Sequence, residues 1–231
     1  METKNYLMIP VCDEPKDVWY EEGIGPEFKS RLDYHKIKFL NTWPTRIVIV
    51  GGAHFGQHSL AYYGYNYINN KYGNFLETPV CFCGTSVESW SNCHELIIFL
   101  AKLINESKPK NFENIEYFYN YALIPRDEIE SCAQILKNNN AVIGCTSFDS
   151  HAERLARTLK SFSLESILFT TYGVGNYPSE SHRKKMIKLE KVFNLVNRLD
   201  PKGFSLLVRI LRYTRLRKRG FRPSLRGVLK S

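Results

Sequence analysis

His151 and Arg154 are the residues of this chain whose types and spacing are best suited to chemistry. They lie three residues apart and follow a hydroxyl-rich stretch, TSFDS, at residues 146–150. A histidine can exchange a proton near neutral pH, and an arginine can hold a carboxylate or phosphate through two parallel hydrogen bonds. The pair therefore predicts acid–base chemistry on an anionic ligand, whereas a surface histidine beside a solvated arginine is the alternative.

The elements around this pair favour the first interpretation. Residues 141–145 (AVIGC) form a short apolar run that predicts a buried strand, and Leu155 and Leu159 lie four apart, as on one face of a helix that begins at His151. A strand, a polar turn and a helix N-terminus are the parts from which open α/β sheets build ligand crevices. We therefore expect His151 at the edge of such a crevice.

The rest of the chain alternates between the same two kinds of element. Short β-branched or aromatic runs predict strands, and the segments between them have helical spacing, which is typical of βαβ units and a largely parallel sheet. The strands are predicted at 5–11, 46–50, 78–83, 114–124, 141–145 and 166–171, and the helices at 27–40, 58–70, 94–104, 126–137 and from 151 onward.

Gly51 and Gly52 end the clearest predicted strand, RIVIV at residues 46–50. Glycines at this place let the backbone approach a phosphate or a carboxylate at the edge of the sheet. They also suit a tight strand-to-helix turn, since glycine adopts backbone angles that other residues avoid. Both interpretations stay open.

Charge is distributed unevenly along the 231 residues, which carry a net charge of +9. Residues 183–231 hold 16 Lys and Arg against two acids, a balance of 16 − 2 = +14, whereas residues 1–182 carry −5. We therefore divide the chain into an α/β domain, 1–182, and a basic helical extension, 183–231, that packs on the domain or trails from it. A basic segment of this kind indicates an acidic partner.

The basic extension contains two helical patterns separated by residues 200–203 (DPKG). Apolar and basic residues alternate at helical spacing in 206–219, LLVRILRYTRLRKR, so the leucines can dock on the domain while the arginines face solvent. We expect docking for 183–211 and a basic arm at 212–231. That arm is a candidate to contact an anionic membrane surface or nucleic acid.

Cysteine use and hydropathy indicate a cytoplasmic protein. The six cysteines are scattered and several lie in apolar runs, which is typical of reduced, buried thiols and not of a disulfide framework. Cys81, Cys83, Cys93 and His94 lack the paired spacing of a zinc site, so no metal is expected. The sequence shows no signal peptide and no apolar run long enough to span a membrane.

Several short motifs and the order of elements resemble a known family. Gly51-Gly52 ends a strand, His151-x-x-Arg154 begins a helix, and the Glu of Asp127-Glu128-Ile129-Glu130 stands where the family pattern has Asn-Thr-x-Glu. With them the chain resembles the YdcF/SanA/ElyC-like family, the bacterial domain of unknown function numbered 218. In that family the later strand ends Thr-Ser-x-x-His-x-x-Arg, and here Thr146-Ser147 stands one residue too far upstream.

Two registers of the family pattern stay open. In the first, Arg31 matches a family arginine on the preceding helix, and residues 79–110 are an insertion. In the second, Gly51-Gly52 belongs to the first strand of the pattern, Gly84-Thr85 is the glycine pair, and Arg31 has no counterpart.

The resemblance implies a Rossmann-like three-layer α/β sandwich with a mostly parallel sheet of five to six strands and a basic helical C-terminal tail. It also implies a polar crevice lined by Arg, Glu, His and Arg. Some members of the family are thought to bind S-adenosylmethionine or a related nucleotide, and others are linked to the cell envelope. Carried over to this chain, the catalytic residues are His151 and Glu130, and the ligand-binding residues are Gly51, Gly52, Arg31, Arg154 and Ser147.

Two functions follow from these observations. The first is a transferase or hydrolase that binds a nucleotide-type or phosphorylated small molecule, with S-adenosylmethionine or a nucleotide as the candidate cofactor. The second is a non-enzymatic binding or adaptor protein that acts through residues 212–231 on nucleic acid or on an anionic membrane, peripheral to its inner face.

Overall fold

The computed structural model describes residues 4–11, 21–38, 46–52, 58–73, 78–84, 86, 88–105, 125–147, 149–170 and 180–218. Within these ranges the strands are β1 (Lys4–Pro10), β2 (Arg46–Val50), β3 (Val80–Cys83), β4 (Ala141–Ser147) and β5 (Glu165–Thr170). The helices are α1 (Pro26–Lys38), α2 (Leu60–Tyr72), α3 (Ser89–Asn105), α5 (Arg126–Asn138), α6 (Asp149–Ser161), α7 (Glu180–Leu199) and α8 (Leu206–Lys218).

The described strands form one parallel sheet in the order β3-β2-β1-β4-β5. The chain runs outward from the central β1 to β2 and β3, and then returns to the other side of β1 for β4 and β5. The strand order therefore reverses between β1 and β4, which is the place where open α/β sheets bind ligands. The fold is Rossmann-like, as predicted.

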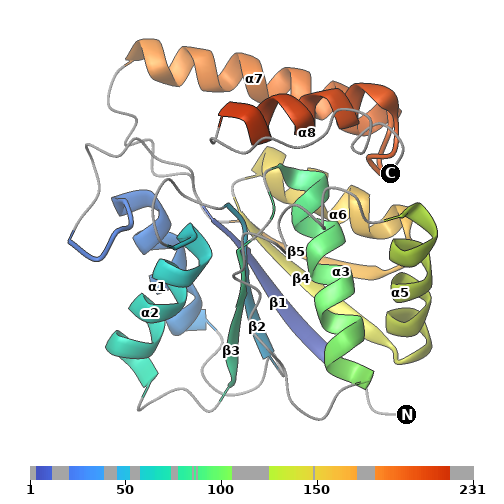
Figure 1. Ribbon diagram of the computed structural model, residues 1–231. Helices are drawn as coiled ribbons and strands as arrows, with labels where there is room; N and C mark the ends of the chain where they lie inside the picture. The colour runs from blue at the N-terminus through green and yellow to red at the C-terminus, as the bar shows by residue number, and fades with distance from the viewer. Residues whose placement is uncertain are drawn as a thin grey trace.

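Helices cover both faces of the sheet, and each face has its own apolar core (Figure 1). In β1, Tyr6 and Met8 belong to the core that the sheet forms with α3, α5 and α6, whereas Leu7 and Ile9 belong to the core formed with α1 and α2. Successive side chains of a strand point to opposite faces, so a strand covered on both sides is apolar throughout. This accounts for the continuous rather than alternating apolar runs in the sequence.

Some predicted boundaries are wrong, and one prediction cannot be compared. Strand β4 extends to Ser147, so the turn predicted from Thr146 begins two residues too early, and α6 begins at Asp149 instead of His151. Helix α3 begins at Ser89 instead of His94, and Ser91 lies in its first turn, where the hydroxyl accepts the backbone N–H of Glu88, the residue before the helix, at 3.0 Å. The predicted strand at 114–124 lies outside the described residues.

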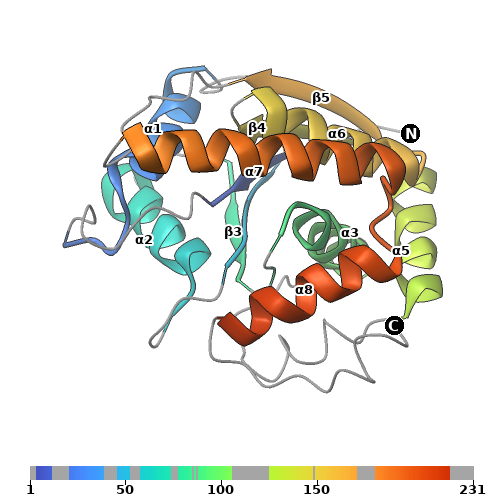
Figure 2. The same ribbon diagram turned by 90° about the horizontal axis from the view of Figure 1, so that it is seen from above.

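Helices α7 and α8 form a hairpin that lies across the ends of the strands (Figures 1 and 2). The turn between them is fixed by Asp200, whose carboxylate accepts the backbone N–H groups of Gly203 (2.9 Å) and Ser205 (2.8 Å). The indole N–H of Trp90 donates to the backbone carbonyl of Asp200 at 2.9 Å and so ties the turn to α3. The two predicted tail helices are thus confirmed, and both contact the sheet domain.

In the part of the chain that the structure describes, no helix is long and apolar enough to cross a membrane. The described cysteines, Cys81, Cys83, Cys93, Cys132 and Cys145, are free thiols, and all except Cys132 are buried. Among the described residues, no group of His, Cys, Asp and Glu is arranged to hold a metal ion.

Candidate functional site

A group of buried polar side chains lies at the ends of β1 and β4, where the strand order reverses. Ser147 is the last residue of β4, and Pro10 is the last residue of β1. Arg31, on α1, donates from Nη1 to the carbonyl of Pro10 at 2.7 Å and is only 3% exposed. Arg31 thus lies at the end of β1, and the choice between the two family registers stays a prediction.

Ser147 and His151 form a hydrogen-bonded pair. The distance between Ser147 Oγ and His151 Nδ1 is 2.8 Å, and both side chains are buried. The pair forms because α6 begins two residues after β4 ends, so the ring in the first helical turn reaches back to the end of the strand. The sequence segment singled out for its chemistry thus brings a hydroxyl and an imidazole together.

The surroundings of His151 keep its imidazole neutral. Burial lowers the pKa of His151 well below its usual value of 6.5, and the positive charges of Arg154, Arg31 and Arg215 lower this pKa further. These arginines come from α6, α1 and α8 respectively. Three helices that are distant in sequence therefore direct positive charge at one histidine, which creates a positive potential at the end of β4.

Arg154 already holds a carboxylate of the protein itself. Its Nη2 donates to Oε1 of Glu190 at 3.2 Å, and its Nη1 donates to the other oxygen of the same group. Its Nε also points to the hydroxyl of Ser89, at 3.4 Å. The predicted bidentate clamp is present, but the anion in it is Glu190 of α7. Ligand binding by Arg154 stays a prediction.

An aromatic ring contacts two of the site's cations. The ring of Phe193, on α7, has the guanidinium of Arg215 4.8 Å from its centroid and that of Arg154 5.9 Å from it. Such cation–π contacts are favourable because the ring face is partly negative. Phe193 therefore stabilises the cation Arg154 of α6 and the cation Arg215 of α8 by contact with the same ring.

Gly51 and Gly52 serve a turn. Their φ angles are +127° and +59°, and their N–H groups donate to the carbonyls of Cys83 and Ser86, both at 2.8 Å. A Cβ added to Gly51 would lie 2.8 Å from a methyl group of Val11. The two amides link the end of β2 to the end of β3, so they are engaged within the protein, and their contact with a ligand stays a prediction.

Glu130 belongs to a different group of contacts. Its carboxylate accepts from Nζ of Lys202 at 2.7 Å, and both side chains are about 40% exposed. Glu130 therefore ties the first turns of α5 to the α7–α8 turn. The structure brings Arg31, Ser147, His151 and Arg154 together, but it gives Glu130 a surface ion pair instead.

Two buried hydroxyl groups near the same edge of the sheet have no hydrogen-bond partner among the described residues. They are Oγ1 of Thr146, the last residue but one of β4, and Oγ of Ser86, which follows β3. Leaving a buried polar group unpaired costs about 1–3 kcal/mol. A polar ligand bound at this edge would satisfy such groups.

Comparison of the chain with protein-family models, with curated proteins and with solved structures finds no match. The function is therefore argued from the geometry of the site.

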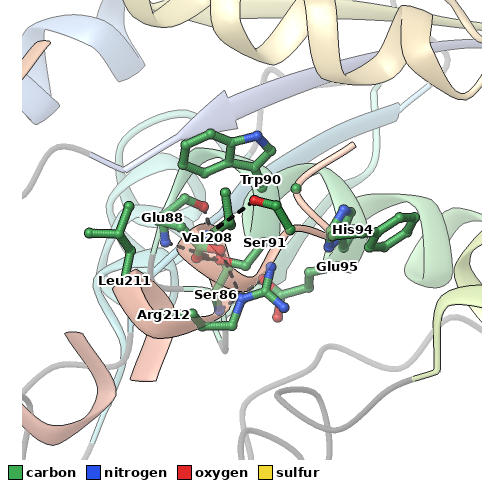
Figure 3. A network of polar contacts seen from close by, with 12 residues as sticks. Ser86, Glu88, Trp90, Ser91, His94, Glu95, Val208, Leu211 and Arg212 are labelled. Atoms are coloured by element: carbon green, nitrogen blue, oxygen red, sulfur yellow. Dashed lines mark hydrogen bonds and ion pairs between the residues drawn. The ribbon is translucent and has the colours of Figure 1, made fainter. Parts of the chain in front are cut away.

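A second buried polar network fixes the hairpin above the site (Figure 3). Arg212, on α8, donates from Nε to Glu88 at 2.9 Å, and the Ser91 hydroxyl also bonds to the Glu88 carboxylate. Burial by itself raises the pKa of Glu88, but the charge of Arg212 and the hydrogen bonds lower it more, so the pKa of Glu88 ends below its usual value. Glu88 is therefore ionised and anchors α8.

His94 completes this anchor. Its Nε2 is 2.7 Å from the carbonyl of Lys202, which makes Nε2 the protonated nitrogen, and its ring stacks on Phe204. Burial and the charge of Arg212 lower its pKa from 6.5 to about 3. A neutral His94 is thus built into the contact between α3 and the turn.

Sequence reasoning missed Glu190, Arg212 and Arg215 as parts of these networks. One signal was available for Glu190, because it is one of only two acids in the strongly basic segment 183–231. An isolated acid in a basic helix indicates a specific cationic partner. For the two arginines no local pattern distinguishes a buried, paired side chain from a solvated one.

Proposed function

We propose that the protein binds a phosphorylated or nucleotide-type small molecule at the ends of β1 and β4. The observation that carries this proposal is the convergence of Arg31, Arg154 and Arg215 on the buried Ser147–His151 pair. Cations at the point where strand order reverses are suited to an anionic ligand, and two of the three, Arg31 and Arg154, are buried. The unpaired hydroxyls of Thr146 and Ser86 support a polar occupant.

The charge of the site favours a phosphate over S-adenosylmethionine. The sulfonium group of S-adenosylmethionine is a cation, and three neighbouring arginines would repel it. A phosphate group would instead offset the arginine charges, and this would raise the pKa of His151 towards its ordinary value. The ligand would thereby make His151 a better proton acceptor.

The reaction class that this arrangement supports is group transfer or hydrolysis. Ser147 would pass its hydroxyl proton to Nδ1 of His151 as its Oγ forms a bond to phosphorus. The bond from phosphorus to the leaving oxygen would break, and His151 would return the proton to that oxygen, while the arginines stabilise negative charge on the phosphoryl group. Glu190 would leave Arg154 when a ligand anion takes its place. Membership in the YdcF/SanA/ElyC-like family remains part of the proposal, supported by the sequence motifs.

A second stretch of the chain matches the family's Asn-Thr-x-Glu element. Asn92-Cys93-His94-Glu95 keeps both the Asn and the Glu, whereas the stretch ending at Glu130 keeps only the Glu. Asn92 is buried at the start of α3, and its Oδ1 would lie 3.4 Å from a Cβ added to Gly51. This placement beside the glycine pair makes Asn92 the better candidate for that element.

The test is calorimetric titration of the full chain with ATP, AMP and S-adenosylmethionine. We expect ATP to bind more tightly than S-adenosylmethionine, and His151→Gln and Arg31→Lys each to weaken ATP binding at least about tenfold. Glu130→Gln is the matched control and should leave binding unchanged. Equal affinity for ATP in all three variants, with their folds intact, would refute the proposal.

A second measurement distinguishes ligand binding from loss of fold. The NMR titration of the His151 ring should show a higher pKa with ATP bound than without it, because the phosphates offset the arginine charges. An unchanged pKa in the presence of saturating ATP would place the ligand elsewhere.

A further inference from the structure

The α7–α8 hairpin presents large aliphatic side chains to solvent on both sides of its turn. Their exposed fractions run from 42% to 78%, with the highest value at Leu199, the last residue of α7. Those of α7 are spaced three and four residues apart, and in α8 the last one lies four and three residues after two adjacent leucines, so those of each helix share one side of it. We call these residues the hairpin patch: Val192, Leu195, Leu199, Leu206, Leu207 and Ile210.

The charged residues of the hairpin are almost all cations. Residues 181–218 contain 12 Lys and Arg and two acids, a balance of 12 − 2 = +10. Both acids are engaged within the protein, since Glu190 holds Arg154 and Asp200 accepts backbone N–H groups of the turn. Lys188, Lys191 and Arg198 are exposed on the same helix as half of the hairpin patch. The outer surface therefore combines aliphatic groups with exposed positive charge.

We propose that the hairpin patch docks on the surface of an anionic lipid bilayer. Aliphatic side chains flanked by lysines and arginines suit the boundary between acyl chains and anionic headgroups, where the apolar groups insert and the cations remain at the phosphates. Figures 1 and 2 show α7 and α8 as an outermost layer, with the end of α7 and the start of α8 meeting at the turn. The hairpin can therefore meet a flat surface first.

The same charges disfavour other occupants. A second copy of the chain placed against this face would bring two strongly cationic segments together, which costs energy through like-charge repulsion. Nucleic acid offers phosphates and stackable bases, but it gives no favourable environment to Leu199 or Leu207. A bilayer rich in anionic lipid matches both the charge and the aliphatic groups.

The docking surface differs from the arm predicted at 212–231. Arg212 is buried in its ion pair with Glu88, so it faces the domain and not the outside. Residues 219–231 lie outside the described part of the chain. The proposal therefore rests on α7 and the first turns of α8, and it does not depend on a ligand at the ends of β1 and β4.

The test is sedimentation of the full chain with vesicles of phosphatidylcholine alone or with one third phosphatidylserine. We expect binding to the phosphatidylserine vesicles only, with affinity that falls as salt rises. The double variant Leu199→Gln/Leu207→Gln should lose at least about tenfold in affinity, because it replaces two exposed leucines that would insert among the acyl chains. The matched control is Ile167→Gln/Leu168→Gln, whose aliphatic residues are also exposed, at 40% and 44%, and belong to β5 instead of the hairpin.

Four outcomes would overturn the proposal. The first is that neither kind of vesicle binds the folded protein, and the second is that the hairpin and control variants bind equally well. The third is a dimer in sedimentation equilibrium that Leu199→Gln/Leu207→Gln dissociates, and the fourth is tight binding to duplex DNA instead of vesicles. Circular dichroism of each variant verifies that its fold is retained.

Discussion

Gly203 and Trp90 are in contact although more than one hundred residues separate them. A Cβ added to Gly203 would lie 2.5 Å from Cδ1 of the indole, and the φ angle of Gly203 is +74°. Two independent requirements, a left-handed backbone and space for the indole, therefore select glycine at this position. The contact fixes the hairpin turn against α3.

Gly203→Ala should destabilise the protein by about 2–4 kcal/mol, since it adds backbone strain to a steric overlap with a buried ring. Gly73→Ala is the matched control, because Gly73 has a φ of −53° and nothing within 4 Å of an added Cβ. It should be neutral or stabilise by up to about 1 kcal/mol. Urea denaturation of both variants measures the difference, and equal midpoints would contradict the assigned role of Gly203.

Arg212→Ala should cost about 3–5 kcal/mol near neutral pH, because it leaves the carboxylate of Glu88 buried without its cation. In this variant burial alone would raise the folded-state pKa of Glu88 above its unfolded value. The penalty should then be present at high pH and shrink as pH falls and Glu88 is protonated. Arg217→Ala, at an exposed position of the same helix, should have little effect. A penalty that is independent of pH would contradict the ion-pair explanation.

His94 should make the protein less stable in mild acid. Its folded-state pKa of about 3 lies below the unfolded value of 6.5, so between these values the unfolded chain binds a proton that the folded chain does not. Stability should be intact above pH 6.5 and decrease as pH falls, by about 2 kcal/mol by pH 5. His94→Gln should show a smaller pH slope in chemical denaturation. The slope should not vanish, because His151 acts in the same direction. An unchanged slope would mean that His94 is solvated.

Glu190→Gln should have opposite effects on stability and on ligand binding. Removing the carboxylate leaves Arg154 buried with a weaker partner, which should cost about 2–3 kcal/mol in unfolding free energy. The freed guanidinium should then bind ATP more tightly than in the unmodified protein. Glu153→Gln is the control, since Glu153 is 53% exposed and 4.0 Å from Arg157. Weaker ATP binding in Glu190→Gln would show that Glu190 does not compete for this anion site.

The sequence predicted the parallel sheet because its strands are short and apolar and alternate with helices. It also identified His151 and Arg154, since the strand, turn and helix that place them are adjacent in the chain. Gly64 shows the limit of such reasoning. A glycine within a helix is ordinarily destabilising, yet a Cβ at this position would lie 2.7 Å from the ring of Phe28, so α1 packs closely on α2 at this point.

The polar networks could not be predicted, because their partners are far apart in sequence. Arg154 and Glu190 are 36 residues apart, and Glu88 and Arg212 are 124 residues apart. No periodicity relates such residues. The sequence of a basic helix does not show which arginine is paired with a distant carboxylate and which is solvated. The role predicted for Glu130 depended on a family pattern and not on a physical requirement, and the structure pairs Glu130 with Lys202.

The attachment of α3 to the hairpin turn has a consequence for biosynthesis. Trp90, His94 and Glu88 emerge from the ribosome more than one hundred residues before Asp200, Lys202 and Arg212, which cover them in the folded protein. Until then an indole, a neutral imidazole and a carboxylate share an open, partly apolar surface on an otherwise formed sheet. Folding of this region must wait until residues 200–212 have left the ribosome, and until then the nascent chain exposes a partly apolar surface that a chaperone can recognise.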